Sequence, residues 1–201
     1  MCLLPGCKTT SEGDDYMAQT ELPAEVCQDY FFDKSYDSCV KISEYYQLEH
    51  DQVFACIDAF SIDKGRLICL QLVGANNLTL NHIEICDSVY SRETESYDCL
   101  KYMAENQLPA DELDSCRTSF SRSDDIMDCF RMVKELGVNS DQIDSCAQSF
   151  QTDHGISSCI DFAATYHLLD AQIVTCSQSH QDQTSKLECL QLTSTTFRYD
   201  D

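Results

Sequence analysis

The chain has 201 residues, and its 35 Asp and Glu against 13 Lys and Arg give a formal net charge of −22. Such a surface repels phosphate groups and anionic lipid headgroups, so the composition excludes nucleic-acid binding through a basic patch, and an electrostatic partner should be cationic. Fourteen cysteines are an unusually high number for this length and favour disulfides formed in an oxidising compartment. The sequence contains no apolar run of about 18 or more residues, so it predicts no membrane-spanning helix.

The N-terminus contains the motif Leu4-Pro5-Gly6-Cys7. This motif resembles the lipobox of bacterial lipoproteins, whose final cysteine is lipidated and becomes the mature N-terminus. The resemblance implies that residues 1–7 are the remnant of a signal peptide and that a lipid on Cys7 holds the protein at the outer membrane, in the periplasm or at the cell surface. The alternative is a disordered N-terminus with two unpaired thiols. Residues 8–19 are polar and lack periodicity, which predicts a flexible tether.

A repeat of 30 residues begins near Thr20 and extends to residue 192, and a polar tail follows at 193–201. Two cysteines recur at this interval: Cys56, Cys86, Cys116, Cys146 and Cys176, and then Cys69, Cys99, Cys129, Cys159 and Cys189. A fixed period between about 20 and 50 residues predicts a repeat array.

Apolar residues around both cysteines follow helical periodicity. An apolar residue lies three positions before the first cysteine and an aromatic residue four positions after it in most units, as with Val53 and Phe60. A second stripe surrounds the second cysteine, as with Leu70 and Val73. Spacings of three and four place these side chains on one helix face. Helices of about 10–14 residues are too short to be stable alone, so we expect an all-α solenoid of about six stacked hairpins, without strands.

Turn and capping signals lie between the helical stretches. Three stretches offer a Ser, Thr or Asp cap for the second helix of their units: 61–65, 121–125 and 151–155. Residues that follow the second helix and favour a turn or a new helix are Gly74, Pro109 and Gly137. Gly137 suits the left-handed position that often ends a helix, and Pro109 suits the first turn of the next helix.

The repeat cysteines allow two regular pairings. Pairing across the longer turn, as in Cys39–Cys56, leaves Cys27 and Cys189 without partners. Pairing within each hairpin uses all of them, so we expect the disulfides Cys27–Cys39, Cys56–Cys69, Cys86–Cys99, Cys116–Cys129, Cys146–Cys159 and Cys176–Cys189. The alternatives are reduced cysteines in a small core, and metal binding, for which one hairpin supplies two of the four ligands that a tetrahedral site requires.

Signals for other chemistry are weak. The histidines share no metal-ligand spacing; they are His50, His82, His154, His167 and His180. His180 takes the aromatic position in the last unit, so we expect a capping residue there, with a ligand role as the alternative. The pairs Asp14-Asp15 and Asp124-Asp125 lack a calcium-loop pattern, and the second suits a helix N-terminus. No phosphate loop or nucleophile motif is found, so no catalytic residue, metal site or cofactor is predicted.

Two family resemblances follow from the repeat. Two parts of the chain resemble the units of a helical-repeat domain of unknown function in secreted bacterial proteins. They are Asp141-Gln-Ile with Phe150-Gln-Thr-Asp, and Phe60-Ser-Ile-Asp-Lys-Gly-Arg-Leu. Those units have the form Gln-Val…Phe-x-x-Asp-x-x-Lys-Leu-x-x-Leu. The chain is more distantly similar to the Sel1-like cysteine-rich proteins, whose repeats are longer. Over residues 20–192 the resemblance implies the fold and assigns no activity.

These observations favour a non-catalytic protein-interaction scaffold of the bacterial cell envelope. The expected partner is a basic protein, and contact with the membrane is expected only through the lipid anchor. The first unit, with its shorter Cys27–Cys39 spacing, and the last, with His180, are expected to cap the array. The alternatives are an envelope hydrolase built on the same array and an acidic, ion-binding structural protein.

Overall fold

The computed structural model describes residues 23–196, which form twelve α-helices and, within that range, no strand. The helices are α1 Pro23–Tyr30, α2 Asp33–Tyr46, α3 His50–Ala59, α4 Asp63–Asn76, α5 Leu80–Val89, α6 Glu93–Asn106, α7 Ala110–Ser119, α8 Ser123–Leu136, α9 Ser140–Ser149, α10 Asp153–Thr165, α11 Asp170–Ser179 and α12 Gln183–Thr196. Cys7, the tether at 8–19 and Asp14-Asp15 lie outside the described residues. The prediction of an all-α array of helical hairpins is confirmed.

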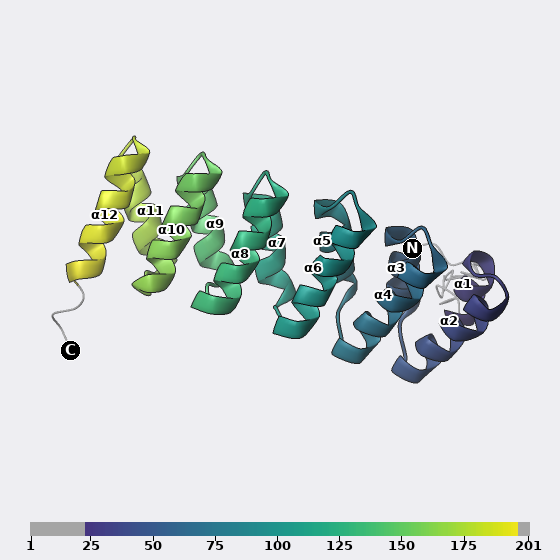
Figure 1. The fold of residues 1–201 in the computed structure, drawn as a ribbon. Helices are drawn as coiled ribbons and strands as arrows, with labels where there is room; N and C mark the ends of the chain where they lie inside the picture. Colours follow the sequence, from purple (N-terminus) through teal and green to yellow (C-terminus); the bar gives the residue numbers. More distant parts are fainter. Residues whose placement is uncertain (1–22, 197–201) are drawn as a thin grey trace, which may run out of the picture.

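The hairpins stack side by side into an elongated array of two rows (Figure 1). The even-numbered helices form one row and the odd-numbered helices form the other. Each helix packs against its hairpin partner, and each odd helix also packs against the odd helices before and after it. A continuous core therefore runs along the array between the rows, as expected for a solenoid whose units cannot bury an apolar face alone.

One disulfide joins the two helices in each of the six hairpins. The pairs are Cys27–Cys39, Cys56–Cys69, Cys86–Cys99, Cys116–Cys129, Cys146–Cys159 and Cys176–Cys189. Their Cα atoms lie between 5.5 Å apart, in the last pair, and 5.9 Å apart, in the first. Pairing across the longer turn is thereby excluded for these twelve cysteines, because each one is already bonded within its own hairpin.

The apolar stripes expected from the sequence form this core. Val53 is fully buried in α3, and Phe60 at the end of that helix is only 2 % exposed. The aromatic position is buried in most units, but His180, which occupies it in the last unit, is exposed. No further unit in the described chain covers His180, which agrees with its expected place at the end of the stack.

The ends of the helices differ in part from the expectations. Gly137 ends α8 in the left-handed conformation, with φ of 67°, as predicted. Gly74 was expected in a turn, but it lies inside α4, and Asn77 takes the left-handed position instead, with φ of 53°. Pro109 precedes the first turn of α7 as its N-cap rather than lying within it. Both differences are shifts of one to three residues. The helix end moves from Gly74 to Asn77 because non-glycine residues also occupy left-handed positions here.

Close packing of the even helices explains why this position in α4 is occupied by glycine. A β-carbon at Gly74 would lie 2.3 Å from Cγ of Tyr46 in α2 and 2.5 Å from its Cβ. The 30-residue register places Ala104, Lys134 and Ala164 at the corresponding positions of the next even helices. Lys134 is the only long side chain of the four, and α6 and α8 are the consecutive even helices that approach each other least. A small residue at this position therefore sets the spacing within the row.

Candidate interaction surface

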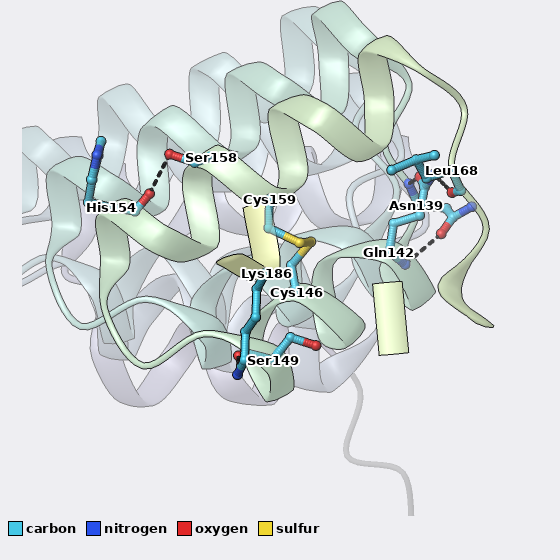
Figure 2. Close-up of a disulfide and its surroundings, with 9 residues drawn as sticks. All are labelled: Asn139, Gln142, Cys146, Ser149, His154, Ser158, Cys159, Leu168 and Lys186. Carbon is cyan, nitrogen blue, oxygen red and sulfur yellow. Dashed lines mark hydrogen bonds between the residues drawn. A yellow bond between two sulfur atoms is a disulfide. The ribbon is translucent and has the colours of Figure 1, made fainter. Parts of the chain in front are cut away.

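A repeated hydrogen-bond pattern joins consecutive units near the N-termini of the odd helices. In α3, Gln52 accepts a bond from the backbone N–H of Glu49 at 2.9 Å and donates through Nε2 to the carbonyl of Leu78, one unit further, at 2.8 Å. Gln142 repeats this in α9, where Nε2 donates to the carbonyl of Leu168 at 2.8 Å (Figure 2). A single side chain thus caps its own helix and bonds to the turn that begins the next unit.

His82 makes the same two bonds in α5. Its Nδ1 accepts from the backbone N–H of Thr79 at 3.1 Å, and its Nε2 lies 3.0 Å from the carbonyl of Leu108. A backbone N–H can only donate and a carbonyl can only accept, so the ring is the neutral tautomer with its proton on Nε2. The imidazole of His82 therefore makes the two structural hydrogen bonds that Gln52 and Gln142 make in their own units. In α7 the pattern is interrupted: Pro109 has no backbone N–H to donate, and the side-chain carboxylate of Glu112 has no N–H to donate to the next unit.

This equivalence predicts different outcomes for two substitutions of His82. His82→Gln should leave the free energy of unfolding nearly unchanged, because an amide supplies the same acceptor and donor. His82→Ala should lower it by roughly 1 kcal/mol, because the buried bond to Leu108 is lost. Urea unfolding followed by far-UV circular dichroism measures both. If the glutamine variant lost as much stability as the alanine variant, the histidine ring itself would be required and the equivalence would be wrong.

A second pattern lies at the turns inside the hairpins. The stretches 61–65 and 121–125 were expected to supply a Ser, Thr or Asp cap, but the N-caps are Ile62 and Arg122, and Ser61 and Ser121 bond to the next unit. The backbone N–H of Ser61 donates to Glu93 Oε1 at 2.7 Å, and the Ser61 hydroxyl donates to the same carboxylate. Ser121 donates to Asp153 Oδ2 at 2.7 Å. The bonds from Ser61 hold the pKa of Glu93 below its ordinary value. Only Thr152 makes the expected cap, accepting from the N–H of Gly155 at 3.1 Å.

Basic residues join the first and last hairpins to their neighbours. Arg66 in α4 donates to the carbonyl of Tyr30, the last residue of α1, at 2.9 Å, and its guanidinium lies over the ring of Phe31. Lys186 in α12 donates at 2.7 Å to the carbonyl of Ser149, the last residue of α9 (Figure 2). Both cations lie at the negative end of an odd helix, where positive charge is stabilising. These residues use two of the few cations of the chain for internal contacts.

The two rows of helices differ in charge. The acidic residues of the odd row are Glu25, Asp29, Asp51, Asp58, Glu84, Asp87, Asp111, Glu112, Asp114, Asp141, Asp144 and Asp170. Arg117 is the only Lys or Arg in these six helices, and it bonds to Asp114 of its own helix at 2.6 Å. The even row carries eight Lys and Arg: Lys34, Lys41, Lys64, Arg66, Lys101, Arg131, Lys134 and Lys186. The odd row is thus a long surface of nearly uncompensated negative charge.

A cleft of about 240 Å³ opens on the odd row between α3 and α5. Its lining combines apolar side chains, among them Phe54 and Ile83, with the carboxylates of Asp58, Glu84 and Asp87. Burial raises the pKa of Asp87, and the nearby charge of Asp58 raises it further. A second cleft, of about 370 Å³ between α4 and α6, is mainly apolar and has Lys64 among its lining residues.

The residues considered for metal binding are not brought together. Within residues 23–196 no group of three or more His, Cys, Asp or Glu side chains is arranged to hold a metal ion. Asp124 and Asp125 lie in the first turn of α8, as expected for helix N-terminal charges, and both face Arg122 at 3.7 Å. The charge difference between the rows was not predicted from the sequence. Counting Lys and Arg in the first helix of each unit would have revealed it.

Comparison with known proteins adds no family. No protein-family model matches the chain, and no curated protein shows significant similarity to it. The architecture alone defines the class: a cysteine-rich helical-repeat protein with one disulfide in each hairpin. Six disulfides indicate an oxidising location, in the periplasm or outside the cell. No helix within residues 23–196 is long and apolar enough to cross a bilayer.

Proposed function

We propose that the protein is a non-catalytic scaffold of the bacterial cell envelope that binds a basic protein through its row of odd helices. The observation that carries the proposal is the charge of this row, in which twelve carboxylates accompany a single, internally paired arginine. A surface of this sign and length accelerates the approach of a cationic partner and selects against anionic ones. A lipid on Cys7, with residues 8–19 as a tether, would hold the scaffold at the outer membrane.

The fold supports this role in two further ways. Stacked hairpins present an extended surface on which several units can contact one partner at the same time. The disulfides and the bonds between units keep this surface in one arrangement, so little ordering is required when a partner binds. Each disulfide stabilises a hairpin whose own core is small.

Capture of partners from an envelope extract tests the proposal. The full protein is immobilised, and bound proteins are identified by mass spectrometry at low salt and at about 500 mM NaCl, where charges are strongly screened. An odd-row variant, Asp58→Asn with Asp87→Asn and Asp144→Asn, is compared with an even-row variant, Asp98→Asn with Asp161→Asn and Glu188→Gln. We expect a basic protein that is captured at low salt, released at high salt, and lost only with the odd-row variant.

Two results would contradict the proposal. Equal loss with both variants would show that total charge matters and the odd row does not. Capture that persists at high salt and with both variants would show that the binding surface lies elsewhere. Circular dichroism of each variant confirms that the helices remain folded.

A further inference from the structure

The cleft between α3 and α5 is a concave site on the negatively charged odd row, and apolar and acidic side chains line it together. Its volume of about 240 Å³ is below the ~300–1,000 Å³ typical of pockets that enclose a small molecule. The apolar part of the lining includes Phe54 and Ala55 from α3 and Ile83 from α5. The acidic part includes Asp58 from α3 and Asp87 from α5, so the two helices contribute a carboxylate each. The cleft therefore suits one long side chain with an apolar stem and a charged end.

The ring of Phe54 is held in place by its neighbours. It is 43 % exposed, which is high for a phenylalanine in the middle of a helix. The ring of His50 stacks parallel to it with centroids 6.3 Å apart, and the ring of Tyr30 meets it edge-on at 6.0 Å. An exposed aromatic ring in a fixed orientation offers a face on which a cation can lie.

Of the carboxylates that line the cleft, Asp51 lies 2.9 Å from Nδ1 of His50, and the other three have no cationic partner in the described chain. No ion pair within residues 23–196 involves Asp58, Glu84 or Asp87. Burial raises the pKa of Asp87, and the negative charge of Asp58 raises it further, as expected for two carboxylates that repel each other. A cation placed between them would offset this repulsion.

We propose that this cleft binds an arginine side chain from a segment of a partner protein, with the guanidinium between the carboxylates of Asp58 and Asp87 and its face toward the ring of Phe54. Charge complementarity selects a cation, and the aromatic ring favours a planar one. Guanidinium also bonds to two carboxylates at the same time, which a compact ammonium group does less well. The inference rests on the proposed scaffold function and assigns one contact within it.

Labelled peptides test the assignment on the full-length, oxidised protein. Three fluorescein-labelled peptides share one sequence of glycine, serine and leucine and differ at two positions, which hold arginine, lysine or neutral citrulline. Binding is followed by fluorescence anisotropy at low salt. The arginine peptide should bind most tightly, the lysine peptide more weakly by about threefold to tenfold, and the citrulline peptide by more than tenfold.

Variants of the cleft locate the binding site. Phe54→Leu keeps an apolar side chain but removes the ring, and it should weaken arginine-peptide binding by about fivefold. Asp58→Asn with Asp87→Asn should weaken binding by at least about tenfold. The matched control, Asp98→Asn with Asp161→Asn, removes the same charge from the even row and should change binding by less than about twofold. Circular dichroism verifies that each variant is folded.

Several outcomes would overturn the inference. These are the absence of arginine-peptide binding, equal binding of the citrulline peptide, and equal weakening by the cleft variant and the even-row control. Its failure can be told apart from failure of the scaffold proposal. A basic envelope protein could still be captured through the odd row while the cleft variants leave peptide binding unchanged. That result would support the scaffold proposal and contradict the arginine site.

Discussion

Replacing Cys116 and Cys129 together with alanine should lower the free energy of unfolding by roughly 3 kcal/mol, which is the contribution expected for a disulfide that closes a loop of this size. The bonded residues are 13 positions apart. Both cysteines are fully buried, so their removal also leaves a small void in the core. The loss should be visible as a lower urea midpoint by far-UV circular dichroism.

The position of the hairpin in the array provides the control. The hairpin of α7 and α8 packs against α9 and α10 on one side and against α5 on the other, whereas the hairpin of α11 and α12 has described neighbours on one side only. Stability in such arrays is the sum of unit and interface terms, so weakening a central unit separates the two halves. The same substitutions at Cys176 and Cys189 should loosen only the last hairpin.

Hydrogen exchange distinguishes these two cases. The central variant should lose amide protection in units on both sides of α7 and α8, and the terminal variant should lose it in α11 and α12 alone. Identical protection patterns in the two variants would show that the array unfolds as a single unit. An unchanged urea midpoint in the central variant would show that the disulfide contributes no stability.

Gly74→Ala is expected to destabilise the fold by roughly 2 kcal/mol, although alanine is the better helix former. The new β-carbon would lie 2.3 Å from Cγ of Tyr46 and 2.5 Å from its Cβ. The Cβ of Tyr46 is attached to the backbone of α2 and cannot rotate away, so α2 and α4 must separate. Overpacking costs about 1–3 kcal/mol or occasionally more, and a clash with a Cβ atom this close belongs at the upper end of that range. The gain in helix propensity returns about 1 kcal/mol.

A second substitution tests the cause. By the repeat register, Asn76 corresponds to Tyr46 and Ala104 corresponds to Gly74, so the double variant Tyr46→Asn with Gly74→Ala copies a pair already present in the chain. We expect the double variant to recover most of the stability lost in the single variant, giving a coupling energy above about 1 kcal/mol in a double-mutant cycle. Additive effects would mean that Tyr46 is not the obstacle and that the spacing of the even helices has another origin.

The period of the sequence was sufficient to predict the architecture. Cysteines and apolar residues such as Val53 and Leu70 recur regularly, and this pattern indicates contacts within a hairpin. These contacts join residues that are close together in the chain. Such contacts follow from helix geometry, because residues three and four apart share a face. The disulfides followed from the same local pairing. The left-handed residue Gly137 was also predictable, because it depends only on the end of its own helix.

Contacts between units were not predictable in this way. Ser61 reads as a cap for its own hairpin, yet it bonds to Glu93, 32 residues later. Gly74 is typical of a turn, yet it lies in a helix, at a position where Tyr46 of the previous unit leaves no room for a β-carbon. In both cases the residue type indicates a role within its own hairpin, but its contact is with a residue of the neighbouring unit. That contact depends on how the hairpins stack.

The sequence by itself determined that this protein is an array of disulfide-bonded helical hairpins with a large excess of negative charge. Only the tertiary structure decided which of these carboxylates lie together. Stacking places the odd helices in one row, so that carboxylates from separate units, such as Asp58 and Asp87, line the same cleft as the exposed ring of Phe54. The physical reason is that helical periodicity acts over a few residues, whereas the spacing and register of the hairpins are set by side chains about 30 residues apart, which no local pattern reports.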